Sequence, residues 1–149
     1  MTYAPPSNNR YLDARVTTAS QPELQLMMLD GALRFGRQSR QIWDDASQGL
    51  EGDRLLRRTI DIVEELVRSV TASPLAEAKR LEEEYAFIYR QLVASRVAHD
   101  AAGLDAALEL LAFQRETWRL ACEKLKVHTT PAPNLNFGSV PASGFSFQA

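Results

Sequence analysis

Apolar residues recur every three or four positions through most of the chain between residues 20 and 126. This spacing follows the 3.6-residue period of an α-helix and predicts amphipathic helices. No segment alternates apolar and polar residues strictly, so we predict no β-sheet. The prolines fall at the edges of the periodic segments, since an interior proline would cost about 3 kcal/mol. The pattern therefore divides residues 20–126 into four predicted helices.

Capping residues mark the expected starts of the first two helices. Ser20 is the natural N-cap of the first helix, and Glu23 three residues later completes a capping box. Pro22 is tolerated in the first turn because its missing N–H would have no partner there. We expect this helix to run to about Ala46 and Asp53 to cap the second helix after a short turn.

Similar signals mark the other two helices. Ser73 is the expected cap of the third helix, with Pro74 at its first helical position and His99 at its end. Asp100 is the expected cap of the fourth helix, which runs to about Lys126. Because the connections are short, consecutive helices should lie antiparallel. We predict an all-α fold, an antiparallel four-helix bundle over residues 20–126 with irregular N- and C-terminal tails.

The two tails differ in composition. Residues 1–19 are expected to form a mobile N-terminal segment. Residues 127–149 contain no Asp, Glu, Lys or Arg, although they hold Phe137, Phe145 and Phe147, half of the six phenylalanines. We keep two alternatives for this uncharged segment: a solvent-exposed, disordered tail, or a tail whose phenylalanines occupy an apolar groove of the bundle.

Composition excludes several classes of function. The 149 residues fit one domain, and a formal net charge of −2 gives no basic surface for nucleic acid. A single Cys and two His make a disulfide or a metal site improbable. No apolar stretch is suited to membrane insertion, and no secretory signal is visible. We therefore expect a cytoplasmic protein without cofactor or metal.

No catalytic constellation is evident, and we predict no enzyme. Cys122 lies on an apolar seam, where we expect it to be a small buried apolar residue. His99 lies at a helix junction, where a role in the turn is expected. Arg115 falls in the seam of the fourth helix between Leu111 and Trp118. Two interpretations of Arg115 are open. In the structural one, it forms a salt bridge or extends its charged end to solvent; in the functional one, it binds a small ligand in a helical enzyme.

Two helices carry more apolar residues than one bundle seam requires. The first helix adds Leu26, Met27, Leu29 and Leu33, and the fourth adds Leu110, Phe113 and Leu120. Such a surplus indicates a partner-binding surface, or a surface covered by the tails or by a second subunit.

Four motifs follow one another in order along the chain. Residues 11–24 are Tyr-Leu-Asp-Ala-Arg-Val-Thr-Thr-Ala-Ser-Gln-Pro-Glu-Leu, and they resemble the opening of the FliS family of flagellar secretion chaperones. Residues 26–35, Leu-Met-Met-Leu-Asp-Gly-Ala-Leu-Arg-Phe, are similar to its Leu-Met-Leu-Tyr-Asp-Gly-x-x-Arg-Phe run. Residues 85–93 are similar to its Tyr-x-x-Met-Tyr-Arg-Arg-Leu segment, and Arg115 and Trp118 fall in its Arg-x-x-Trp pattern. The resemblance covers roughly residues 11–126.

Three departures from the family pattern stand out. Gln21-Pro22 replaces Pro-Gly, Leu29 replaces the usual aromatic residue, and Ser95-Arg96 replaces Ala-Asn.

The resemblance implies a cytoplasmic chaperone for flagellar type III secretion. It would bind the disordered C-terminal segment of flagellin, prevent premature polymerisation and deliver flagellin to a component of the export gate. The surplus apolar faces suit such helix-in-groove recognition. A monomer and a homodimer are both compatible with this interpretation. The alternative function is another helical adaptor or a regulator of flagellar assembly.

The resemblance and the apolar surplus together suggest a set of flagellin-binding residues. Tyr11 and Val16 belong to the N-terminal segment, which we expect to cover part of the empty groove. The groove wall or base is assigned to Leu26, Met27, Leu29, Leu33 and Phe35. Three aromatic residues, Tyr85, Tyr89 and Trp118, either shape the groove or pack in the core. Plain core positions are expected at Leu24, Met28, Leu81, Ile88, Leu92 and Leu111.

Overall fold

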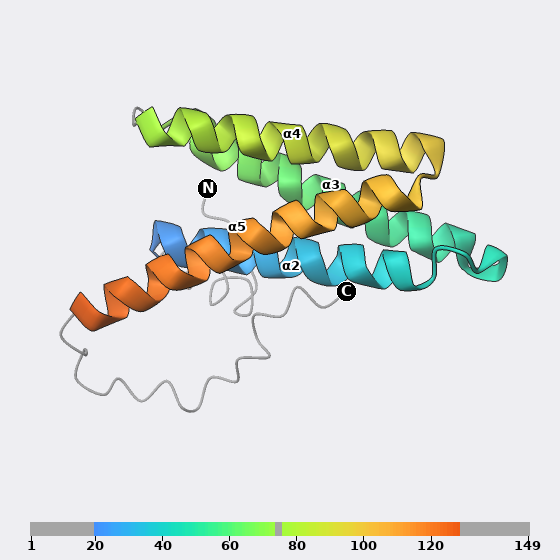
Figure 1. The fold of residues 1–149 in the computed structure, drawn as a ribbon, viewed down its shortest axis with the longest axis horizontal. Coiled ribbons are helices and arrows are strands. Elements are labelled where there is room, and N and C mark those ends of the chain that lie inside the picture. Colours follow the sequence, from blue (N-terminus) through green and yellow to red (C-terminus); the bar gives the residue numbers. More distant parts are fainter. Residues whose placement is uncertain (1–19, 74–75, 129–149) are drawn as a thin grey trace, which may run out of the picture.

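The computed structural model describes residues 20–73 and 76–128, which fold into four long α-helices and one short 3₁₀ helix. The elements in chain order are α2 (Gln21–Gln41), the 3₁₀ helix η1 (Ala46–Gln48), α3 (Gly49–Thr71), α4 (Ala76–Ala98) and α5 (Ala101–His128) (Figure 1). The predicted all-α four-helix bundle is confirmed. Residues 1–19 and 129–149, which make up nearly all of the two predicted tails, lie outside the described residues.

Each helix packs against two others. α2 contacts α3 and α5, and α4 contacts the same two helices. Ion pairs join α2 to α5 at two levels, between Arg40 and Asp105 and between Asp30 and Arg115. This pairing requires α2 and α5 to run antiparallel. Figure 1 shows α4 and α5 meeting at their connecting turn and diverging toward the C-terminal end of α5.

The core is built from the inward faces of all four helices. Its residues include Leu29, Leu33, Leu56, Val63, Leu66, Tyr85, Ile88, Leu92, Leu104 and Leu111. Of the expected core positions, Ile88, Leu92 and Leu111 are buried, whereas Leu24, Met28 and Leu81 are only partly buried.

α2 and α5 approach closely at Gly36. A Cβ atom there would lie 2.5 Å from Leu108 Cδ2 and 3.5 Å from the Thr59 side chain. Glycine therefore lets the two helices pack without displacing Leu108.

Two of the expected N-caps are confirmed. The Ser20 hydroxyl accepts a hydrogen bond from the Glu23 N–H at 3.3 Å, and the Asp100 carboxylate accepts one from the Gly103 N–H at 3.1 Å. His99 has φ of 48° between α4 and α5, and its ring stacks on Trp43 with centroids 4.3 Å apart. His99 thus has the expected role in the turn. The expected start of the third helix at Pro74 lies outside the described residues.

The predicted boundary between the first two helices is wrong. α2 ends at Gln41 instead of Ala46, and α3 begins at Gly49, four residues before Asp53. The reason is local hydrogen bonding by Asp45. Its carboxylate accepts hydrogen bonds from the Ser47 N–H at 3.0 Å and the Gln48 side chain at 2.9 Å, which hold the intervening turn as η1.

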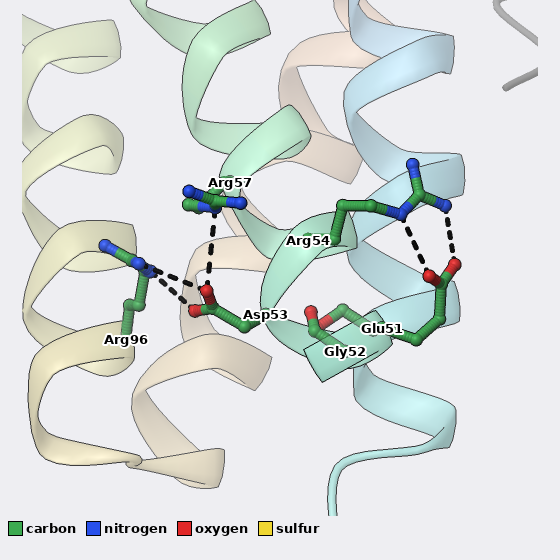
Figure 2. Close-up of polar contacts among 7 residues, drawn as sticks. Glu51, Gly52, Asp53, Arg54, Arg57 and Arg96 are labelled. Atoms are coloured by element: carbon green, nitrogen blue, oxygen red, sulfur yellow. Dashed lines mark hydrogen bonds and ion pairs between the residues drawn. The ribbon is translucent and has the colours of Figure 1, made fainter. Parts of the chain in front are cut away.

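Asp53 lies inside α3 and links that helix to α4 (Figure 2). Arg96 donates from Nε to Asp53 Oδ1 at 2.7 Å and from Nη2 to Oδ2 at 3.1 Å. Arg57, one turn along α3, lies 3.5 Å from the same carboxylate. The hydrogen bonds from Arg96 lower the pKa of Asp53 below its ordinary value. Asp53 is therefore a bridging residue and not an N-cap.

The Asp53–Arg96 pair predicts a pH-dependent contribution to stability. Because the pKa of Asp53 is lower in the folded state, its stabilisation is present above the ordinary Asp pKa and is lost as pH falls through the lowered value. Replacement Asp53→Asn should reduce the free energy of unfolding by about 0.5 kcal/mol at pH 7, since solvent screens this exposed pair. Urea denaturation at pH 7 and below about pH 3 should show the difference disappearing in acid.

Asp61→Asn is the matched control, since Asp61 lies on the same helix, is exposed, and forms no ion pair with the residues the structure describes. An equal loss of stability in both variants would contradict the role given to the Arg96 bridge.

Candidate partner-binding surface

Two of the residues assigned to a groove wall lie in the bundle core. Leu29 and Leu33 are buried among the residues of α3, α4 and α5. Since α2 packs against both α3 and α5, it has two covered sides, and these leucines face the interior. The expectation that they form surplus surface is therefore wrong.

Phe35 is buried in a separate setting beneath two arginines. The Arg34 guanidinium carbon lies 5.0 Å from the ring centroid, and that of Arg58 lies 4.4 Å away. Attraction between the cations and the ring holds these side chains over Phe35. Phe35 can therefore support the Arg34 and Arg58 side chains from inside the bundle, but its own ring is not accessible to a partner.

Tyr85 and Trp118 come together in a hydrogen-bond chain across all four helices. Trp118 Nε1 of α5 donates to the Tyr85 hydroxyl of α4 at 2.9 Å, and that hydroxyl donates to Gln25 Oε1 of α2 at 2.6 Å. Gln25 Nε2 donates to Ser69 Oγ of α3 at 2.8 Å, and Ser69 donates to the Leu66 carbonyl at 2.6 Å. The chain satisfies Gln25, which is fully buried.

This setting assigns Tyr85 to the core. Burial raises the pKa of Tyr85 above its usual range, so the hydroxyl keeps the proton that it donates to Gln25. Core packing was one of the two alternatives that the sequence left open for Tyr85 and Trp118, but Gln25 was not predicted. Its position four residues before Leu29 on the inward face of α2 was the available signal.

The other predicted residues are spread over different faces. Leu26 and Met27 are half-buried on α2. Tyr89 is half-buried on α4 beside arginines of α3, near Arg57 and Arg58. Tyr11 and Val16 lie outside the described residues. Among the described residues, the predicted set is thus divided between the core and the surfaces of separate helices.

Exposed apolar side chains gather instead between α4 and α5. Phe87 is 52% exposed and Phe113 is 69% exposed, and both line a cleft of about 400 Å³ with Leu110 and the buried Ile88. Leu120 is also exposed and lies seven residues after Phe113, two turns further along the same face of α5. We call Phe87, Leu110, Phe113 and Leu120 the α4–α5 apolar strip.

The strip was predicted in part. The surplus apolar character of Leu110, Phe113 and Leu120 is confirmed by their exposure. Phe87 was missed, although it lies two residues after Tyr85 and therefore about 200° around the helix from that core position. The cleft is also lined by charges of both signs from α4, namely Arg80, Glu83 and Glu84. An exposed apolar strip with a charged rim is the kind of surface that amphipathic helices bind.

Arg115 is not buried in the seam as expected. Its side chain is 40% exposed and pairs with Asp30 of α2. The salt bridge to Asp30 is the structural alternative that the sequence offered for Arg115. Cys122 is buried, and burial raises the pKa of its thiol, as suits a packing residue.

Residues 20–73 and 76–128 contain neither a metal-binding cluster nor a membrane-spanning helix. Within these ranges, no cluster of His, Cys, Asp and Glu is arranged to hold a metal ion. Among the helices formed there, none has the length and apolar character needed to cross a membrane.

The fold and the strip define a four-helix bundle with a candidate protein-binding surface. Residues 3–125 match the family described as Flagellar protein FliS. The chain therefore belongs to the FliS family, a family of flagellar export chaperones. No curated protein matches the sequence.

The four-helix hydrogen-bond chain predicts a specific loss of stability. Tyr85→Phe removes one hydroxyl and leaves Gln25 Oε1 and the Trp118 N–H without their partner. The free energy of unfolding should fall by about 2 kcal/mol. The reason is that these buried groups would then have a hydrogen-bond partner only in the unfolded state, where water supplies one. Urea denaturation followed by helical circular dichroism measures this change.

Tyr89→Phe provides the control, because the Tyr89 hydroxyl makes no hydrogen bond to any residue of the described part and is half-buried on the same helix. We expect a change below about 0.5 kcal/mol. Similar losses in the two variants would contradict the importance of the network.

Proposed function

We propose that this protein is a cytoplasmic export chaperone that binds the disordered C-terminal segment of flagellin. Binding would prevent premature polymerisation and present flagellin to a component of the flagellar type III export gate. Membership of the FliS family supports the chaperone role. The observation that carries the proposal is the α4–α5 apolar strip, a surface suited to an amphipathic segment.

The strip has the dimensions of a short helix-binding site. From Leu110 to Leu120, α5 rises about 15 Å at 1.5 Å per residue, which equals nearly three turns of a bound helix. Leu110, Phe113 and Leu120 would contact apolar residues spaced three, four or seven apart on the cargo. The charged rim at Arg80, Glu83 and Glu84 would face the polar side of the same helix.

A disordered cargo must lose conformational entropy when it folds on the chaperone. Each fully buried Phe or Leu contributes about 1.5–3 kcal/mol, so one short strip offsets the ordering of only a few turns. We therefore propose that flagellin extends onto further contacts. The exposed or half-buried candidates are Leu26, Met27, Tyr89 and Trp118, together with Tyr11 and Val16 of the N-terminal segment. Leu29, Leu33, Phe35 and Tyr85 would support these contacts from inside the bundle.

Calorimetric titration with a flagellin C-terminal peptide tests the function. The unmodified protein should bind the peptide one-to-one. The double replacement Phe87→Ser and Phe113→Ser should weaken binding at least tenfold, because about 1.4 kcal/mol of lost apolar burial corresponds to a factor of ten. Both side chains are largely exposed, so the bundle should keep its unfolding midpoint.

Leu50→Ser is the matched control. Leu50 is 92% exposed near the start of α3 and does not line the cleft, so its loss should leave the affinity unchanged. No binding by the unmodified protein would contradict the chaperone function. Full binding by the double variant would instead contradict the assignment of the strip.

A further inference from the structure

We propose that the chain's own C-terminal segment, residues 129–149, docks on the α4–α5 apolar strip when no cargo is bound. The docking itself is independent of the cargo's identity. Its effect on cargo binding rests on the proposed function, because the segment would occupy the place proposed for flagellin and flagellin would have to displace it.

The strip differs from the other exposed apolar residues of the bundle. Leu50 and Val97 are highly exposed but do not line this cleft, and single apolar residues on a surface are ordinary. Phe87, Leu110 and Phe113 instead share one cleft of about 400 Å³ with the buried Ile88 at its wall. Clustered apolar side chains of this kind mark a surface that another segment covers.

Composition favours the C-terminal segment as the occupant. It has three phenylalanines and no Asp, Glu, Lys or Arg, so it can enter an apolar cleft without removing a charge from water. The N-terminal segment has no phenylalanine and carries Arg10, Asp13 and Arg15. An uncharged segment also meets both signs of the rim, at Arg80 and Glu84, without repulsion.

The connection of the segment to α5 brings it within reach. Phe113 lies 15 residues before the end of α5 at His128, a distance of about 22 Å along the helix. Phe137 follows His128 by nine residues, which can span up to about 30 Å when extended. Pro131 and Pro133 disfavour continuation of the helix and favour an extended path. The chain after α5 is therefore long enough for Phe137 and the phenylalanines beyond it to reach the strip.

Fluorine NMR of the full chain labelled with 4-fluorophenylalanine tests the docking. The triple replacement Phe137→Ser, Phe145→Ser and Phe147→Ser should shift the signals of Phe87 and Phe113, assigned with Phe87→Leu and Phe113→Leu. It should also raise their relaxation by a soluble paramagnetic agent severalfold. Truncation after Thr130 should have the same effect.

The matched control replaces three serines of the same segment, Ser139, Ser143 and Ser146, with alanine, and should leave both signals unchanged. Unchanged signals in the phenylalanine variant and in the truncated chain would overturn the docking. Protection that disappears on dilution would assign the cover to a second copy and would also overturn it.

Calorimetric titration of the same variants with the flagellin peptide tests the competition. The phenylalanine variant should bind at least threefold more tightly than the unmodified chain, because no segment has to be displaced. Equal affinities would overturn the competition. Absence of binding by every form would contradict the proposed function, while the fluorine signals would still decide whether the segment docks.

Discussion

The Tyr85 hydroxyl is the point at which the four helices of the bundle are joined. It accepts a hydrogen bond from Trp118 of α5 and donates one to Gln25 of α2, which continues to Ser69 of α3. Apolar side chains can pack in several registers, whereas a buried amide has few positions in which its hydrogen bonds are satisfied. We infer that this chain fixes which face of each helix points inward, and so decides which apolar residues remain outside.

The exposed strip follows from that arrangement. On α4, Tyr85 faces the interior, so Phe87, two residues later, must face outward. On α5, Trp118 contacts Tyr85 from the core side, while Phe113 lies on the outer side of the cleft. The exposure of Phe87 and Phe113 shows that no other part of the described bundle covers them. The candidate site is thus a product of packing and not of a catalytic motif.

The helical period was sufficient to predict four helices, and side-chain capping identified Ser20 and Asp100 correctly. Capping rules failed at Asp53, because α3 begins earlier, at Gly49, directly after the turn that Asp45 holds by hydrogen bonds to Ser47 and Gln48. Periodicity also failed at Leu29, since it shows which residues share a stripe but not that α2 has helices on two sides. Surface assignments need this knowledge of neighbours, whereas helix assignments depend on local spacing alone.

The buried thiol of Cys122 gives the bundle a built-in reporter. It is the only cysteine of the sequence, it lies in the last third of α5, and burial suppresses its thiolate form. A thiol reagent should therefore react with it more slowly than with an exposed cysteine, and faster whenever this part of α5 separates from the bundle. The rate of modification then reports on local opening of the helix that carries most of the apolar strip.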